Sequence, residues 1–369
     1  MEARFVRVLR AVRGATTASI VSMRGTEFAS RLAIIVLFWV GSGFVIGGGL
    51  TPGELMSFYA LVGYLTGPVT QLVGANRSIQ DALIAADRLF EILDLEAEVE
   101  HRGVEVARIR SDIEGSERAP ADVVLESVRF RYGAHRRIFD GLDLRIPEGS
   151  YTAFVGESGS GKSTLISVLQ KLYPIESGTV KIGRTDLREI DTVSLRRWVA
   201  AVPQVTHLFA RSVIENIALG DPAPDMARVL ELCDALEITP FVRALPLGFH
   251  TILGENGAEL SGGQRQRLSI ARALYREPRL LLLDEATSHL DSRGEAVVRR
   301  RISALRETSA TVVAVAHRLS TVVGADRILV FDGGRVTEEG KHDELIRGDG
   351  LYAELWRQQT ECVRATSVA

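Results

Sequence analysis

The chain has 369 residues, of which 46% are hydrophobic and 25% are charged, and its formal net charge is −3. This composition excludes a disordered chain, and the length suits two domains or one large domain with a second piece. The mild acidity, with no basic patch interleaved with aromatic residues, argues against a nucleic-acid partner. Cys233 and Cys362 lie far apart in the sequence, which argues against a disulfide scaffold and fits a reducing compartment.

The first predicted elements are two apolar segments near the N-terminus. Residues 32–53 contain no charged side chain, and a second charge-free stretch covers residues 55–76. A helix needs about 20 apolar residues to cross a bilayer. Because a glycine-rich turn at 47–53 separates the two stretches, the sequence predicts a membrane hairpin with spans at about 32–50 and 55–76. Two buried helices of a soluble domain are the alternative.

The distribution of basic residues predicts how this hairpin is oriented. Six arginines precede the first span, the connecting turn has neither Lys nor Arg, and Arg77 and Arg88 follow the second span. Cytoplasmic segments next to membrane helices are enriched in such residues. We therefore expect a multi-pass protein of the cell (cytoplasmic) membrane, in contact with membrane lipid, with everything after residue 77 in the cytoplasm.

Changes in composition predict the domain boundaries. Residues 1–94 form a partial transmembrane domain, whose last part keeps apolar residues at helical spacing. Residues 95–122 are polar and charged and predict a linker. From residue 123, short β-rich runs alternate with helical patterns, which indicates an α/β domain over residues 123–360. Residues 361–369 remain as a tail.

A glycine-rich motif lies between a predicted strand and a predicted helix of this domain. Gly156-Glu-Ser-Gly-Ser-Gly-Lys-Ser163 matches G-x-x-x-x-G-K-[ST]. Its backbone N–H groups and the following helix N-terminus suit phosphate oxygens, Lys162 supplies a positive charge, and Ser163 offers a hydroxyl to Mg²⁺. A plain glycine-rich turn is the alternative. The expected ATP-binding residues of this loop are Gly156, Glu157, Ser158, Gly159, Ser160, Gly161, Lys162, Ser163 and Thr164.

A run of four leucines ends in two carboxylates, Asp284 and Glu285. Four consecutive leucines are typical of a strand that is buried on both faces of a parallel sheet. Ligands bind at the carboxyl ends of such strands, so we expect Asp284 on a strand that neighbours the strand before the phosphate loop, as a ligand of Mg²⁺. Glu285, one residue further, is the candidate general base that deprotonates the attacking water.

Leu260-Ser-Gly-Gly-Gln-Arg-Gln-Arg267 lies between the phosphate loop and the Asp-Glu pair. Ser261 and Gln264 form a capping-box pattern, so a well-capped helix is the plain alternative. Together with the two preceding motifs, however, this segment resembles the signature of ABC transporters. The resemblance implies a P-loop ATPase domain with a helical subdomain. It further implies that Ser261, Gly262, Gly263 and Gln264 contact the γ-phosphate that a second such domain binds.

The same resemblance assigns three further residues. Tyr132 is similar to the aromatic residue that stacks on adenine, although alone it reads as an ordinary strand aromatic. Gln204, in Val202-Pro-Gln204, resembles the glutamine that contacts Mg²⁺ or the attacking water. His317 resembles the histidine that contacts the γ-phosphate. The expected catalytic residues are Glu285, His317 and Gln204, and the expected ligands of Mg²⁺ are Ser163, Gln204 and Asp284.

The resemblance extends over nearly the whole chain. The segment Ala86-Asp-Arg-Leu-Phe-Glu-Ile-Leu-Asp94 is similar to the exit from the last membrane helix of ABC exporters. That family has more membrane helices before the ATPase, so we expect a chain truncated at its N-terminus relative to the family. The implied protein is an ATP-hydrolysing exporter subunit that works with a second ABC subunit, as a homodimer or heterodimer, on an unknown substrate. A soluble ABC-type ATPase and a non-transporting remnant are the alternatives.

Overall fold

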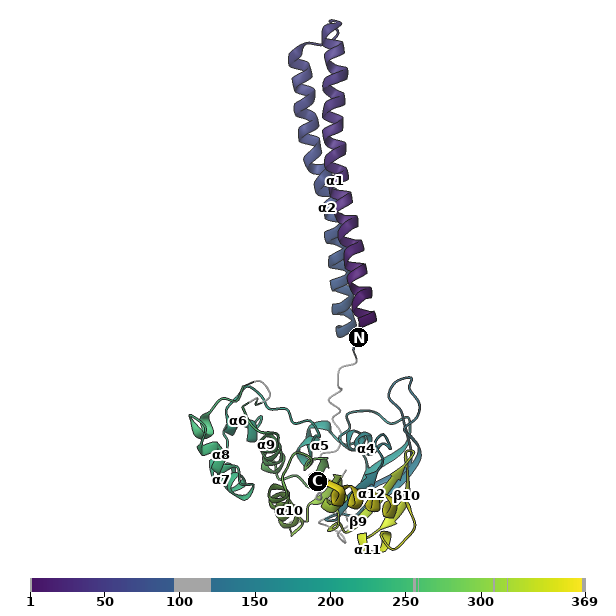
Figure 1. Ribbon diagram of the computed structural model, residues 1–369, viewed down its shortest axis with the longest axis vertical. Coiled ribbons are helices and arrows are strands. Elements are labelled where there is room, and N and C mark those ends of the chain that lie inside the picture. Colours follow the sequence, from purple (N-terminus) through teal and green to yellow (C-terminus); the bar gives the residue numbers. More distant parts are fainter. Residues whose placement is uncertain are drawn as a thin grey trace. The chain divides into compact units, whose positions relative to one another are not determined.

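The structure, a computed structural model, describes residues 2–95, 121–254, 257, 259–307, 309–316 and 318–366 (Figure 1). It divides into two units, residues 1–99 and residues 100–369, which are described separately below. Nearly all of the predicted linker, 95–122, lies outside the described residues, and so does His317.

Two long helices, α1 (Glu2–Ile46) and α2 (Pro52–Leu93), make up the described part of the first unit. They pack side by side as a hairpin (Figure 1). A capping box begins α2: the Thr51 hydroxyl accepts from Glu54 N at 3.2 Å, and the Glu54 carboxylate accepts from Thr51 N at 2.7 Å. Two backbone donors of the first turn therefore have partners, which favours a helix start at this residue.

The hairpin closes tightly at one glycine. A Cβ placed on Gly41 would lie 2.2 Å from Leu55 Cδ1, and Leu55 is only 8% exposed. The ring centroids of Phe38 and Tyr59 lie 5.4 Å apart near this contact. Small residues of this kind let two membrane helices approach closely. Away from the contact, apolar side chains face outward, as at Trp39, which is 79% exposed.

One segment among the described helices, Glu27–Ile46 of α1, is long and apolar enough to cross a membrane. It begins earlier than the predicted span at 32–50. It also ends earlier, because Gly47–Gly49 form the turn after the helix. The second predicted span, 55–76, lies within α2, and its hydropathy does not reach that of Glu27–Ile46 because glycine, threonine and glutamine interrupt it. Both helices exceed 40 residues, so each is about twice as long as a bilayer requires.

The second unit contains two sheets. Its strands are β1 (Val123–Phe130), β2 (Phe139–Ile146), β3 (Tyr151–Gly156), β4 (Ser177–Ile182), β5 (Thr185–Asp186), β6 (Val199–Val202), β7 (Leu280–Asp284), β8 (Thr311–Val315), β9 (Arg327–Asp332) and β10 (Arg335–Gly340). The antiparallel sheet has the order β2-β1-β4-β5, and the larger sheet has the order β10-β9-β3-β8-β7-β6. In the larger sheet, β6, β7, β8, β3 and β9 are parallel, so their carboxyl ends meet at one edge.

Helices cover the larger sheet, and those that come between β6 and β7 in the sequence form a separate group (Figure 1). The helices of this unit are α4 (Lys162–Leu169), α5 (Thr192–Trp198), α6 (Val213–Ile217), α7 (Met226–Ala235), α8 (Thr239–Arg243), η1 (Gly248–His250), α9 (Gly262–Tyr275), α10 (Ser292–Glu307), η3 (Leu319–Thr321), α11 (His342–Leu345) and α12 (Leu351–Thr366). Helix α12 runs across the predicted boundary at 360/361 to Thr366, and that boundary stays a prediction.

The leucine run of β7 shows how the core is built. Leu280 and Leu282 belong to one hydrophobic cluster of the domain, while Leu281 and Leu283 belong to the other. Successive side chains of a strand point to opposite faces, so an apolar strand buries both of its faces only when layers cover each side. The larger sheet is thus a central layer, and at its carboxyl edge β7 ends in the polar residue Asp284.

Candidate active site

The glycine-rich loop connects β3 to α4 at the carboxyl edge of the larger sheet. Gly156 has φ +145°, and a Cβ at this position would lie 2.1 Å from the carbonyl oxygen of Phe331. Gly161, immediately before α4, has φ +103°, and its Cβ would lie 2.7 Å from the Phe139 ring. Both positions therefore require glycine, for conformation and for space, and together they bring the loop backbone close over the start of the helix.

We expect Gly156→Ala to destabilise the domain by more than about 3 kcal/mol, because the new methyl group meets backbone rather than a movable side chain. Gly159→Ala is the matched control, since Gly159 has φ +84° but open space around its Cβ position. It should cost only about 1–2 kcal/mol. Thermal unfolding of the two variants measures the difference, and equal losses would contradict the steric argument.

Lys162, the first residue of α4, is folded over its own loop. Its ammonium donates to Gly156 O at 2.9 Å, to Glu157 O at 2.7 Å and to Ser160 Oγ at 3.0 Å, and the residue is only 5% exposed. Burial lowers the pKa of Lys162, against the opposing effect of three nearby carboxylates, Glu285, Asp284 and Glu157. A buried cation of this kind favours an anion close to the loop.

Ser163 and Asp284 meet at the same edge of the larger sheet, and their role as metal ligands stays a prediction. The Ser163 hydroxyl donates to Asp284 Oδ1 at 2.9 Å, although the two residues are 121 positions apart. Asp284 ends β7, which is not adjacent to β3, because β8 lies between them. The sequence reasoning expected a neighbouring strand, and that detail is wrong. A hydroxyl and a carboxylate are hard oxygen donors, so this pair fits a magnesium ion that also binds phosphate oxygens.

Gln204 and Glu285 also lie together. The Gln204 amide donates to Glu285 Oε2 at 2.7 Å, because β6 and β7 are parallel neighbours and both residues follow the ends of these strands. Glu285 has φ +50°, which is unusual for a residue with a side chain. Backbone in this region often marks functional positions, since the surrounding contacts must hold it there.

The signature segment begins α9. Ser261 Oγ accepts from Gln264 N at 3.2 Å, and Gln264 Oε1 accepts from Ser261 N at 2.9 Å, which is the predicted capping box. A Cβ on Gly263 would lie 3.1 Å from His289 O, so the small residues bring α9 close to the loop after β7. Within the described part of the chain, the capping box and the phosphate loop share no hydrogen bond.

Tyr132 follows β1 and is half-buried. Its ring lies edge-on to Phe130 and to Tyr173, with centroids 5.0 Å and 4.9 Å away. The remaining predicted residue, His317, is outside the described residues, so its role stays a prediction.

Sequence reasoning missed one polar residue beside this site. Gln266 of α9 is 1% exposed, its amide donates to Glu285 O at 3.2 Å, and its carbonyl oxygen accepts from His289 N at 3.1 Å. The only sequence signal was a glutamine on the apolar face of the signature helix. Such a residue needs buried partners, but the sequence does not say which.

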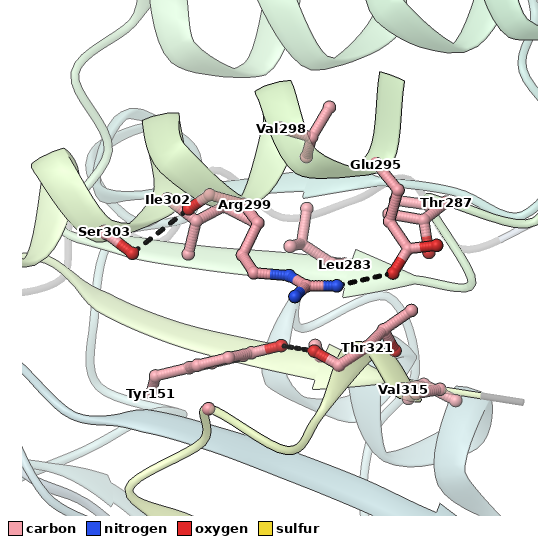
Figure 2. Close-up of a pocket in the computed structure, with 14 residues that line it drawn as sticks. Tyr151, Leu283, Thr287, Glu295, Val298, Arg299, Ile302, Ser303, Val315 and Thr321 are labelled. Carbon is pink, nitrogen blue, oxygen red and sulfur yellow. Dashed lines mark hydrogen bonds and ion pairs between the residues drawn. The ribbon is translucent and has the colours of Figure 1, made fainter. Parts of the chain in front are cut away.

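A separate cavity of about 90 Å³ lies behind the loop that follows β7 (Figure 2). Apolar side chains from α10 and from the larger sheet line it. On the α10 side, Arg299 Nη2 forms an ion pair with Glu295 Oε1 of the same helix at 2.7 Å. On its other side, the Tyr151 hydroxyl donates to Thr321 O at 3.4 Å. None of the phosphate-loop residues lines this cavity, so it is distinct from the candidate active site.

The chain is similar to a known protein family and to several curated proteins. The family model described as ABC transporter matches residues 139–288. The ATP-dependent lipid A-core flippase of Desulfotalea psychrophila is 38% identical over 335 residues, which cover 90% of this chain and 56% of the flippase. The alpha-hemolysin translocation ATP-binding protein HlyB of Escherichia coli O157:H7 is 38% identical over 338 residues, covering 91% of this chain and 46% of that protein. The chain thus spans about half the length of the curated relatives it matches.

A solved structure of a bacterial Atm1-family ABC exporter with ATP bound is also similar. It aligns with a TM-score of 0.72 and 33% identity over 96% of this chain and 62% of that chain. The phosphate loop, the carboxylates that end β7 and the signature helix all occur in the order and fold of this family. The chain therefore carries the ATP-binding domain of the ABC transporter family, preceded by helices that resemble those of ABC exporter subunits.

Proposed function

We propose that the chain is an ATP-hydrolysing subunit of an ABC exporter, in which hydrolysis drives export of a substrate across the cell membrane. The observation that carries the hydrolytic part is the meeting of two polar pairs at one sheet edge. Ser163 Oγ donates to Asp284 Oδ1 at 2.9 Å, at the end of β7. Gln204 Nε2 donates to Glu285 Oε2 at 2.7 Å, one residue after β7. One pair offers oxygen ligands, and the other offers a base with a polar partner.

The residues divide the chemistry as follows. The backbone N–H groups of the phosphate loop and the Lys162 ammonium bind and orient the phosphates of ATP. Ser163 and Asp284 would hold Mg²⁺, with Gln204 as a further ligand, and the ion supplies neutralisation of phosphate charge. The Glu285 carboxylate takes the proton of the attacking water, and the Gln204 amide fixes the direction of that carboxylate.

The signature segment at the start of α9 indicates how two subunits would assemble. We propose that Ser261, Gly262, Gly263 and Gln264, at the start of α9, complete the nucleotide site of a second ABC subunit, as the resemblance to ABC transporters implies. That subunit is another copy of this chain or a related one. Segment Glu27–Ile46 supports a place in the lipid bilayer. The arginines that flank the hairpin favour an ATPase domain in the cytoplasm.

Phosphate release by the purified chain in lipid nanodiscs tests hydrolysis. We expect steady turnover of ATP with Mg²⁺ and its loss after EDTA, since the two oxygen ligands would then face uncompensated phosphate charge. ATP bound without turnover at any Mg²⁺ concentration would contradict the proposal. The lipid and toxin named for the relatives define the first cargo classes for a test of ATP-dependent movement in sealed vesicles.

We expect Tyr132→Ala to weaken ATP binding by roughly 0.5–1.5 kcal/mol, the value of an aromatic contact. Because a ring stacks on any purine face, GTP should lose a comparable amount. Phe130 and Tyr173 contact the edge of the Tyr132 ring and would keep the fold intact. Equilibrium binding of both nucleotides measures the effect, and unchanged affinity for both would leave Tyr132 as a packing residue of the sheet.

A further inference from the structure

Gln266 connects the signature helix to the backbone that carries the candidate base. Its amide nitrogen donates to Glu285 O at 3.2 Å, and its amide oxygen accepts from His289 N at 3.1 Å. The side chain therefore spans the two ends of the segment 285–289 that follows β7. Both ends of a nearly fully buried amide are used on this one segment.

The segment needs such a connection because its backbone is strained at its first residue. Glu285 has φ +50°, a left-handed conformation that is unfavourable for a residue with a Cβ. Backbone–backbone hydrogen bonds also hold this residue: Glu285 N donates to Val315 O at 3.1 Å, and Ser288 N donates to Glu285 O at 3.1 Å. The first bond fixes the strand side and the second closes the turn, while Gln266 fixes the turn against α9.

Other polar residues of α9 have different partners. Arg272 donates to Asn216 O at 2.8 Å and to His207 O at 2.9 Å, so it holds the segment before and within α6. Arg265 donates to Leu260 O at 3.0 Å, at the start of its own helix. Among the described hydrogen bonds of α9 side chains, those to residues 285 and 289 come from Gln266.

We propose that Gln266 is a positioning residue for ATP hydrolysis, which holds the Glu285 backbone so that its carboxylate stays beside Gln204. This inference rests on the proposed function, in which Glu285 is the base. Loss of the Gln266 bonds would let the left-handed residue relax toward ordinary backbone, and the carboxylate would then leave its place. Binding of ATP to the phosphate loop would be unaffected, because Gln266 does not contact that loop in the described hydrogen bonds.

The test compares Gln266→Met with the wild-type chain in lipid nanodiscs. Methionine has a similar volume and removes both hydrogen bonds, so we expect kcat to fall about 5- to 30-fold while KM for ATP stays within about twofold. Gln266→Glu is the second variant, because it keeps the acceptor for His289 N and changes only the group that faces Glu285 O. It should lose kcat in the same range.

A matched control separates positioning from general destabilisation. Leu232→Ala removes a buried side chain of α7 in the same hydrophobic cluster and should lower Tm at least as much as Gln266→Met. Its kcat should nevertheless stay within about twofold of wild type. An equal loss of kcat in Leu232→Ala would overturn the proposal, because reduced stability would then explain both variants.

A double-mutant cycle with Glu285→Gln completes the experiment. If Gln266 acts through the base, Gln266→Met should lower the residual turnover of Glu285→Gln by no more than about twofold. Fully multiplied losses, or an unchanged kcat in both Gln266 variants, would contradict the positioning role while leaving the proposed function standing. A wild-type chain without ATP turnover would contradict both.

Discussion

Glu285→Gln should lower the turnover of ATP by about 10²–10⁴-fold while ATP binding is retained. The amide matches the carboxylate in size and still has an oxygen that accepts from Gln204, but it does not take up the proton of the attacking water. The substitution also keeps a Cβ and the same backbone conformation, so the fold should be unaffected. Phosphate release and equilibrium binding of ATP measure the two quantities on one sample.

The control for this variant is Glu189→Gln, which neutralises an exposed carboxylate in the turn between β5 and α5. It should hydrolyse ATP at the wild-type rate. Turnover of Glu285→Gln within about threefold of that control would remove Glu285 from the role of base, since loss of a base costs far more.

Lys162→Ala should lower both ATP affinity and turnover by at least about 10²-fold. The ammonium is the cation that donates to Gly156 O, Glu157 O and Ser160 Oγ, so its removal takes away a charge for phosphate and three bonds that shape the loop. Because burial already lowers the pKa of Lys162, the substitution also removes a desolvated charge, and Tm should change little. Nucleotide binding and thermal unfolding, measured side by side, test this combination.

Lys181→Ala is the matched control, since Lys181 pairs with Glu126 at 2.7 Å on the surface of the smaller sheet. Surface pairs contribute little, so this variant should bind and hydrolyse ATP normally. Lys162→Ala with wild-type affinity for ATP would mean that the loop backbone alone holds the phosphates.

Much of the site could be predicted because its parts have local patterns. The glycine spacing of the phosphate loop is legible in the sequence, since Gly156 and Gly161 both take conformations that other residues avoid. The four leucines before Asp284 indicate a strand buried on two faces, which is how β7 packs. In each case a short stretch of chain determines its own geometry.

The rest depends on which segments the fold brings together. The placement of β8 between β3 and β7 follows from crossover connections, and local periodicity does not determine strand order. Gln266 lies 19 positions before Glu285, and their contact exists only because α9 packs against the end of β7. The second predicted span, 55–76, is a different case. It forms a regular helix, but its glycine and polar residues lower its hydropathy below that of a typical membrane span.

The uniform composition of β7 has a consequence for folding fidelity. Four identical leucines give the strand no internal marker of register, because a shift by one residue would still place leucine at most of their positions. The markers must therefore lie at the ends, where Arg279 N donates to Trp198 O and Glu285 N donates to Val315 O. A slip that moved Asp284 to the buried position of Leu283 would bury a carboxylate without water, at a cost of several kcal/mol. The residues proposed for chemistry thus also exclude misaligned pairings of the central strand.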